Sequence, residues 1–358
     1  MRRNSMASWL SERIPVSSQT LKELANEPVP IHMKQWWFCL GGTPAYLFLV
    51  QIITGILLAF YYQATPQAAW ESVSFITNDV SFGWYIRSIH KWAATLMIAT
   101  MILHQMRVYF TGAYRRPREI NWVIGMAILL CTLLVGFTGY SLVFEQLSFW
   151  GATVASNICD AVPMVGAWSK RMLLAGEQYN PQTLPRLYIL HAAVLPATII
   201  ALLGIHITLI RMHGVSEPEP PSKLGDLSTE GGASRRYFDF FPDHMMSEMM
   251  IGIGLMILLS FLATLFPSAM GPRADSLTTP EVIKPEWFFY VSFRWLKLFS
   301  LSFAVLSSGL IVLSMVLWPW FDSLLRRVTR NEDISVYIGI VATLLLIGLT
   351  VWEAVVAH

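Results

Sequence analysis

The distribution of charge along the chain constrains its fold more than any other feature. A helix of about 20 largely apolar residues spans the hydrocarbon layer of a membrane. One candidate span, Trp84–Phe110, has an uncharged centre and charged ends, and charges at the ends of a span can reach the membrane interface. We therefore expect an all-α integral membrane protein with seven transmembrane helices. The other six spans are the stretches of 19 residues or more without Asp, Glu, Lys or Arg: Gln35–Trp70, Ile120–Phe144, Leu187–Ile210, Met249–Pro272, Leu298–Phe321 and Ile334–Trp352.

The overall composition supports this interpretation. Only 13% of the 358 residues are charged, 54% are hydrophobic, and the mean hydropathy is +0.51. Soluble domains carry about 25% charged residues, so a water-soluble enzyme and a disordered protein are excluded. The net charge of +2 is too small to indicate a polyanionic partner, and no nucleic acid is expected to bind. Membrane lipid is the expected surrounding.

The basic residues predict the orientation. Sixteen of the 25 lysines and arginines fall on the side of the N-terminus if the seven spans alternate. Because basic residues concentrate in cytoplasmic loops, the N-terminus is expected on the cytoplasmic (n) side of a bacterial inner membrane. The opposite face is called the p side.

The chain also divides into parts by composition. Residues 1–35 are interrupted by charges and are expected to form an n-side surface segment. Residues 36–213 hold four spans, and residues 245–358 hold three. The connection over 214–244 contains a polar stretch rich in Pro and Gly, Ser216–Gly232, and is expected to be an n-side linker.

Four of the eight histidines lie inside predicted spans, which is unusual for an ionisable side chain. His90 and His104 are 14 residues apart on the second span, and His191 and His206 are 15 apart on the fourth. Fourteen helical residues rise about 21 Å and return to within about 40° of the same face. Since the two spans run in the same direction, His90 pairs in depth with His191, and His104 with His206. Two levels of paired imidazoles suit two bis-histidine haems.

Two further patterns favour haem. Arg87 and Arg107 each lie three residues from a histidine, near an interface, where a guanidinium can pair with haem propionates. Glycines in the first and third spans repeat the spacing of 14 and would let a flat macrocycle approach the helix backbone closely. They are Gly41 and Gly55, and Gly125 and Gly139.

Three motifs resemble cytochrome b of the cytochrome bc complexes: Gly139–Leu142 (GYSL), Ser148–Val154 (SFWGATV) and Pro285–Phe288 (PEWF). The 15-residue gap between the histidines of the fourth span is similar to the b6f branch. There, the four-helix cytochrome b6 and the three-helix subunit IV are usually separate chains, whereas here the linker joins them. The resemblance thus implies a four-helix di-haem bundle followed by a three-helix part.

The resemblance also implies a function, that of a quinol oxidoreductase that passes electrons to cytochrome c or a plastocyanin-type acceptor. Quinol is oxidised at the p side, one electron goes to a Rieske iron–sulfur protein and on to a c-type cytochrome subunit, and the other crosses two b haems to an n-side quinone site. This Q cycle translocates protons. A homodimer is expected from the resemblance alone.

Site residues are implied by the same resemblance. Glu286 would be the p-side quinol ligand and proton acceptor, since a carboxylate at an apolar interface has a raised proton affinity. Trp287, Tyr140 and Phe149 would line the same pocket. Cys39 resembles the position where b6f-type cytochromes attach an extra haem, ci, through one thioether. Two carboxylates at the start of the fifth span are candidates for n-side proton uptake and quinone binding: Asp243 and Glu248.

The chain departs from the family at two places. Val143-Phe144-Glu145 replaces the usual Pro-Trp after GYSL, and Phe288 replaces a tyrosine. Other interpretations of the histidines also stand at this level: hydrogen-bonded structural side chains, a di-haem b membrane anchor of a dehydrogenase or hydrogenase, and a transporter with a histidine proton relay.

Overall fold

The computed structural model describes residues 28–30, 36–216 and 237–356. Most of these residues are helical, as expected. Most of the expected n-side surface segment (1–35) and of the expected linker (214–244) lies outside the described residues, and both expectations stay untested.

Two short strands bring the beginnings of the two parts of the chain together. They are β1 (Pro28–Pro30) and β2 (Tyr237–Asp239), and they pair antiparallel with Val29 opposite Phe238. One strand precedes the first long helix, and the other precedes the first helix of the C-terminal part. The pairing therefore lies at the end of the molecule where both of these helices begin.

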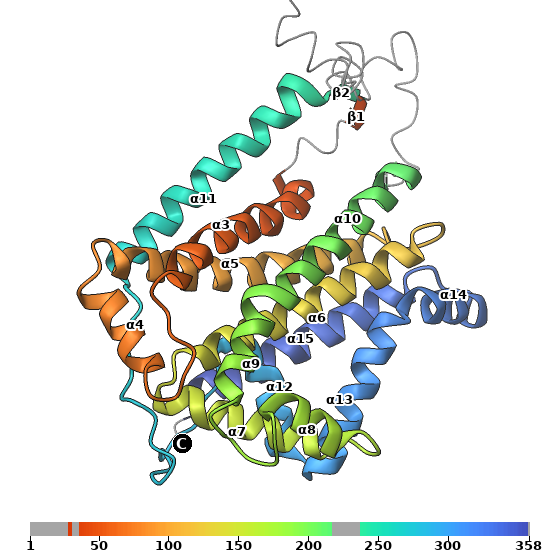
Figure 1. Ribbon diagram of the computed structural model, residues 1–358. Coiled ribbons are helices and arrows are strands. Elements are labelled where there is room, and N and C mark those ends of the chain that lie inside the picture. The colour runs from red at the N-terminus through yellow and green to blue at the C-terminus, as the bar shows by residue number, and fades with distance from the viewer. Residues whose placement is uncertain (1–27, 31–35, 217–236, 357–358) are drawn as a thin grey trace, which may run out of the picture.

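Four long helical segments lie side by side in the first part of the chain (Figure 1). They are α3 (Gly42–Ala59), α5 (Gly83–Phe110), α6 (Glu119–Leu142), and the continuous run of α9 (Thr183–Ile189), the π-turn η3 (Leu190–Val194) and α10 (Leu195–His213). Shorter helices precede or connect them: the 3-10 turn η2 (Trp36–Gly41), α4 (Ala69–Asn78), α7 (Gln146–Asp160) and α8 (Gly166–Leu174).

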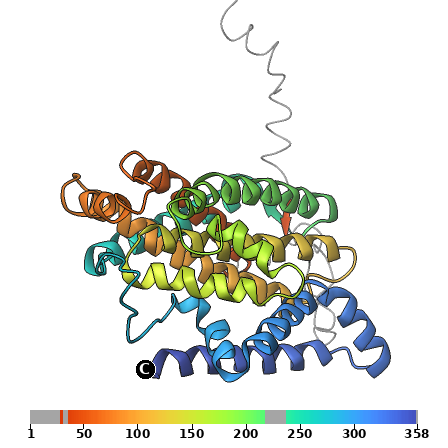
Figure 2. The ribbon, with the colours of Figure 1, turned by 60° about the horizontal axis from the view of Figure 1, so that its bottom comes forward.

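The C-terminal part packs on this bundle from two directions. Its first helix contacts α5 and α3, while its remaining helices lie along another side of the bundle, drawn in blue in Figure 2. Its elements are η4 (Phe240–His244), α11 (Met245–Leu265), η5 (Trp287–Phe289), α12 (Tyr290–Leu298), α13 (Leu301–Val316), α14 (Trp318–Thr329) and α15 (Ile334–Val355).

The main core joins five helices of both parts. Ile89, Ala93 and Met97 recur every four residues, which places them on one face of α5. That face packs against Leu47 of α3 and Leu259 of α11, both fully buried. Between membrane helices this association rests on close van der Waals packing, since lipid tails are as apolar as the side chains themselves. Large apolar side chains cover the outward faces, as lipid contact requires.

Five of the helical segments are long and apolar enough to cross a membrane, and a sixth is added if the bent pair α13–α14 is one span. The helix α5, which the sequence predicts as the second span, has 28 residues but carries three basic side chains and does not belong to this set. An integral membrane protein is supported, and the count of seven is not established by length and composition.

Three of the predicted spans run past the ends of their helices. The fifth is predicted over Met249–Pro272, but α11 ends at Leu265. The sequence predicts the first span over Gln35–Trp70, but α3 ends at Ala59 and the chain turns before α4. It predicts the sixth over Leu298–Phe321, but α13 ends at Val316 and α14 leaves at 77°. Pro319 lies in the first turn of α14, where it lacks the N–H that would continue the previous helix.

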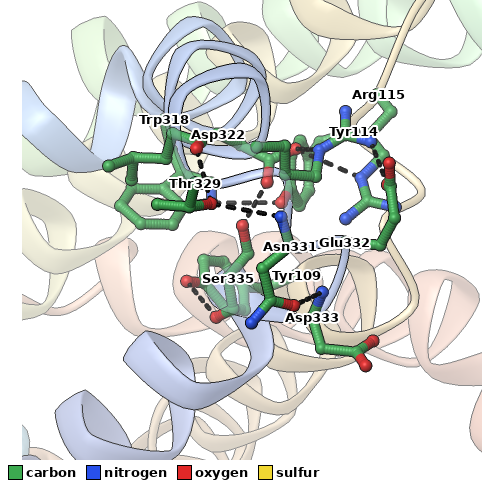
Figure 3. Close-up of polar contacts among 12 residues, drawn as sticks. Tyr109, Tyr114, Arg115, Trp318, Asp322, Thr329, Asn331, Glu332, Asp333 and Ser335 are labelled. Carbon is green, nitrogen blue, oxygen red and sulfur yellow. Dashed lines mark hydrogen bonds and ion pairs between the residues drawn. The ribbon is translucent and has the colours of Figure 1, made fainter.

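A buried polar cluster holds α14 in its bent position (Figure 3). The Asp322 carboxylate is fully buried and accepts hydrogen bonds from Arg115, at 3.1 Å, and from Arg326, at 3.2 Å. The hydroxyl of Ser335, at the start of α15, also donates to it. Because Arg115 follows α5, the cluster joins the four-helix bundle to the C-terminal part.

Candidate functional site

His90 and His191 face each other inside the bundle. His90 lies on α5, and His191 lies in the π-turn before α10. Their ring centroids are 6.2 Å apart and their planes are inclined by 71°. The structure thus brings together the two imidazoles whose depths the sequence predicts to match.

Hydrogen bonds determine which nitrogen of each ring carries the proton. The Thr54 hydroxyl donates its single proton to the Val50 carbonyl at 2.7 Å, so its oxygen accepts from Nδ1 of His90 at 2.8 Å. Nδ1 of His191 donates to the Val135 carbonyl at 3.0 Å. Both rings therefore keep their lone pair on Nε2, and partners of this kind orient metal-ligating histidines.

The geometry of this pair fits a haem iron. Two nitrogen ligands at about 2 Å from one metal ion place the ring centroids about 6 Å apart, close to the observed 6.2 Å. Among the described residues, no group of three or more His, Cys, Asp or Glu side chains could hold a metal ion. A pair of histidines without further protein ligands suits haem, whose porphyrin supplies the remaining nitrogens.

The second couple, His104 and His206, lies toward the other end of the bundle. Both side chains line one cavity, between α3, α5, α6 and α10, that extends inward along an apolar wall including Met97 and Ile199. The Asn121 carbonyl faces the His206 imidazole. The wall thus offers two imidazoles and an apolar slot between helices, which suits a flat macrocycle. The two ends of the bundle are named after these couples, as the His90 end and the His104 end.

Each of the four predicted glycines faces one of the four imidazoles. A Cβ atom at these positions would lie between 2.5 and 3.5 Å from Cε1 of the ring. At Gly139 the imidazole would have to move, whereas at the other three glycines the Cβ would be in close or ordinary van der Waals contact with it. The observed close approach is that of imidazole to backbone, and the approach of a macrocycle stays a prediction. The pairs are Gly41 with His104, Gly55 with His90, Gly125 with His206, and Gly139 with His191.

The π-turn explains how a 15-residue spacing matches a 14-residue one. The N–H of Leu195 donates to the Leu190 carbonyl, five residues back instead of four. One residue is thereby added without changing the face on which the following helix continues. His206 then stands to His191 as His104 stands to His90. Pro196 follows directly and has no N–H to donate.

The two arginines expected near haem propionates have different surroundings. Arg87 donates to the carbonyls of Ser268 at 2.5 Å and Ala269 at 3.2 Å, so it fastens the segment that follows α11. Arg107 lies in the last turn of α5 at the His104 end and is partly buried. A role of either side chain toward propionates stays a prediction.

Glu286 lies at the His90 end, directly before η5 and α12. Its Oε1 is 3.8 Å from Nζ of Lys91, the residue after His90. The carboxylate side chain is 25% exposed, while the lysine side chain is 53% exposed. The carboxylate is thus joined to a cation on the same helix as one member of the imidazole couple.

The neighbouring aromatic residues face inward. The ring of Phe288 and the side chain of Ile98 on α5 both pack against Gly136 of α6. Nε1 of Trp287 is buried and has no hydrogen-bond partner among the described residues. A buried donor without a partner is rare in proteins and needs an explanation.

Tyr140 and Phe149 border this region from α6 and α7. The Tyr140 ring packs on Gly151, and its hydroxyl lies within electrostatic range of the carboxylates of Glu145 and Glu286. The Phe149 ring packs at a tilt on Tyr179, with 4.8 Å between centroids and 52° between planes. The structure thus places Tyr140 within electrostatic range of Glu286, while the rings packed around Phe149 are those of Phe144, Trp150 and Tyr179.

Glu145, at the departure from the family pattern, closes one side of the His90 end. Its carboxylate accepts from the Gly271 N–H at 2.7 Å, and the N–H of Gln146 donates to the Pro272 carbonyl at 2.9 Å. The Ala274 N–H donates back to Phe144. Phe144 and Glu145, which depart from the family pattern, therefore hold the segment between α11 and η5 by hydrogen bonds.

At the His104 end, Glu248 lies against the start of α3. A Cβ atom on Gly42 would be 2.6 Å from its Oε2, and its Oε1 is 3.8 Å from Nε2 of His244. Asp243 directly precedes this histidine and is exposed. Cys39 lies in η2, just before Gly42, but its side chain lies outside what the structure describes.

Sequence reasoning missed the partners of these residues. Thr54 lies one residue before Gly55 on α3, and Lys91 follows His90. Neither residue type signals such a role by itself. A threonine or lysine adjacent to a member of the spacing pattern is the only signal that could have drawn attention to them.

Comparison with known proteins gives the family. The family model described as cytochrome b/b6/petB matches residues 24–214, and the one described as cytochrome b(C-terminal)/b6/petD matches residues 273–357. Cytochrome b6 of Heliomicrobium gestii is 46% identical over 210 residues, which are 59% of this chain and 99% of that protein.

Two further similarities extend over nearly the whole chain. A cytochrome bc complex cytochrome b subunit of Chlorobaculum thiosulfatiphilum is 34% identical over 355 residues, 97% of this chain and 80% of that protein. A chain of a solved structure described as a hyperthermophilic respiratory Complex III shares the fold, with a TM-score of 0.83 at 23% identity, over 99% of this chain and 92% of that one. The expected resemblance is confirmed: the chain belongs to the cytochrome b/b6 family, with the b6 and subunit IV parts in one polypeptide, and is the cytochrome b subunit of a bc/b6f-type quinol oxidoreductase.

Proposed function

We propose that this subunit oxidises quinol at the His90 end and reduces quinone at the His104 end, as the membrane-spanning catalytic subunit of a proton-translocating Q cycle. One observation carries the proposal: each end of the bundle presents one couple of imidazoles, which face each other at the His90 end and line one cavity at the His104 end, and Glu286 lies at the His90 end. A di-haem anchor for a dehydrogenase or hydrogenase would have no use for this carboxylate or for the three-helix part.

The family implies b haems, and we propose two. His90 and His191 would hold one, and His104 and His206 the other. When bound, they supply one-electron carriers between the two quinone sites. The protein side chains orient the ligands: Thr54 and the Val135 carbonyl keep Nδ1 protonated and Nε2 free at the His90 end.

The p-side quinol site lies at the His90 end. A quinol gives up two protons and two electrons, one electron to a Rieske iron–sulfur protein and one toward the His90 couple. The Glu286 carboxylate accepts one of the protons, and the other is released to water on the p side. Trp287 Nε1 is the buried donor for a quinone oxygen, which accounts for its lack of a partner among the described residues. Tyr140 and Phe149 line the pocket.

The n-side quinone site lies at the His104 end. Glu248 packs against the start of α3, close in sequence to Cys39, and can deliver protons there together with Asp243. Cys39 would hold haem ci through one thioether. Arg87 and Arg107 would pair with haem propionates, for which Arg87 would exchange its carbonyl partners.

In the membrane we propose seven spans, since α5 is long enough at about 42 Å for 28 residues and packs between α3 and α6. The N-terminus then faces the cytoplasm of a bacterial cell. The chain divides into a surface segment (1–35), a haem-binding part (36–213), a linker (214–244) and a subunit IV-like part (245–358). A c-type cytochrome, the Rieske protein and a second copy of this chain complete the complex.

Purification of the native complex tests this function. We expect two b-type α-bands in the reduced-minus-oxidised spectrum, and a Rieske protein and a c-type cytochrome among the co-purified subunits. A colourless polypeptide, or one with a dehydrogenase in place of these partners, would overturn the proposal.

Thr54→Val should weaken the binding of haem iron by the couple of His90 and His191. Valine keeps the shape but removes the acceptor for the Nδ1 proton, and losing such a partner costs about tenfold or more in metal affinity. Since the hydrogen bond makes the imidazole more basic and favours ferric iron, we expect the midpoint potential of that b haem to rise. A redox titration measures both b haems, and the other one should be unaffected. Thr54→Ser is the matched control; a valine variant identical to the wild type would contradict the role of Thr54.

Cys39→Ala should abolish covalent haem. We expect one haem to stay with the wild-type polypeptide after acid–acetone extraction and none to stay with the variant. Cys131→Ala and Cys159→Ala are matched controls, because both thiols are free, and they should retain it. Complete extraction from the wild type would rule out the thioether.

A further inference from the structure

A fully buried carboxylate near the end of the chain is not used by the proposed mechanism. Glu353 lies in the last turn of α15 and has no exposed surface. Its Oε2 is 3.1 Å from Nε of Arg294, and its Oε1 is 3.2 Å from Nζ of Lys297. Both cations belong to α12, the helix that directly continues the segment carrying Glu286. The pairing therefore ties the end of α15 to the helix behind the proposed proton acceptor.

The same turn of α15 also holds the segment before Glu286. Nζ of Lys284 donates to the Ala354 carbonyl at 3.1 Å. The Arg294 guanidinium lies 4.4 Å from the centre of the Trp352 ring, in cation–π geometry. Three consecutive residues of α15, from Trp352 to Ala354, thus contact residues on both sides of Glu286.

Tyr290 shows that the two carboxylates share one electrostatic environment. Burial raises the pKa of its phenol, and the negative charges of Glu286 and Glu353 raise it further. The Lys284 ammonium lies 5.3 Å from the centre of the same ring. The ring therefore lies within electrostatic range of both carboxylates, and a movement of α12 away from Glu353 would also move the surroundings of Glu286.

We propose that Glu353 is a positioning residue for quinol oxidation: it holds α12, and through α12 it holds Glu286 in place beside Lys91. The inference rests on the proposed function of Glu286. A carboxylate between two cations can be replaced by an amide of the same shape without a cavity, but the buried Arg294 and the partly exposed Lys297 then lose their counter-ion and the contact loosens. Misplacement of a reacting group by about 1 Å can cost up to about a hundredfold in rate.

The test compares two fully buried carboxylates of the C-terminal part. Glu353→Gln should lower kcat/KM for quinol about tenfold, while the spectra and potentials of both b haems stay those of the wild type. Asp322→Asn is the matched control, because Asp322 is also fully buried between two cations but lies at the His104 end. It should leave kcat/KM per b haem unchanged. Equal losses in both variants would show a general effect on folding and overturn the proposal.

A double variant identifies the route of the effect. If Glu353 acts through Glu286, Glu353→Gln adds no further loss once Glu286 is Gln, since the two changes affect one interaction. Additive losses overturn the proposal. Lys284→Met changes a half-buried side chain outside the Glu353 pairing and provides a second test should Glu353→Gln fail to assemble. We expect about a threefold loss, and an unchanged kcat/KM overturns the proposal. Should Glu286→Gln itself have no effect, the proposed function fails, whereas an effect of Glu286→Gln without one of Glu353→Gln removes only this inference.

Discussion

Removal of Ala193 should leave both imidazole couples intact, although it shortens a membrane helix that carries two of the four histidines. Ala193 lies in the π-turn η3, where the Leu195 N–H reaches back five residues to Leu190. Without one residue this turn becomes an ordinary α-helical turn, and His206 keeps its direction relative to His191. We expect both b-type α-bands at wild-type intensity.

Removal of Ala99 should have the opposite result. Ala99 lies between His90 and His104 on α5, which is α-helical throughout Gly83–Phe110 and has no extra residue to give up. One residue fewer turns His104 by about 100° and moves it by about 1.5 Å, so it no longer faces His206. One b-type band should be lost. The measurement is the reduced-minus-oxidised spectrum of both deletions, and loss of a band from the Ala193 deletion would show that the π-turn does not act as the spacer.

The histidine couples are predictable because they depend on the helix repeat alone. A known rise and turn per residue gives the depth and face of two residues on one helix, and depth is common to all spans. With the α-helical repeat alone, a spacing of 15 residues turns His206 about 100° further from His191 than a spacing of 14 turns His104 from His90. The π-turn compensates for this difference. Such a turn depends on which carbonyl the Leu195 N–H selects, and residue types alone do not determine that choice.

Partners from other helices could not be predicted. Thr54 meets His90, and Lys91 meets Glu286, only because α3, α5 and the segment before α12 pack with particular rotations about their axes. Those rotations follow from the shapes of side chains in the core, such as Ala93 against its neighbours, and not from the apolar character of each helix.

The ends of helices are predicted less well than their existence. A prediction based on uncharged stretches continues the sixth span through Trp318-Pro319-Trp320, because these residues are uncharged. The bend, however, lies within them. The bend depends on Asp322, whose partner Arg115 is 207 residues away in the sequence. In the sequence, Asp322 is a charge that ends the predicted span. In the structure it is buried in a cluster that only the tertiary structure creates.

Glu286→Gln should cause the largest loss of turnover of any single change outside the histidines. Glutamine keeps the size and one oxygen of the side chain but cannot accept the quinol proton, and a positioned base contributes about a hundredfold or more. We expect quinol–cytochrome turnover to fall by about that factor, with both b haems present and their spectra unchanged. The measurement is steady-state turnover, together with the rate at which quinol reduces the b haem of the His90 end.

The control for this variant lies in the same segment. Glu281→Gln makes the same chemical change five residues earlier, on an exposed side chain, and should leave turnover unaltered. Lys91→Met tests the orientation of the Glu286 carboxylate without removing the base itself. The ion pair between the two residues is partly exposed and contributes little to stability, so we expect a smaller loss of turnover than in Glu286→Gln. A carboxylate that takes the proton must matter more than the cation that orients it. Full turnover in Glu286→Gln would assign the proton to another acceptor, and the neighbouring Glu145, which the Gly271 N–H already binds, would then be the next carboxylate to test.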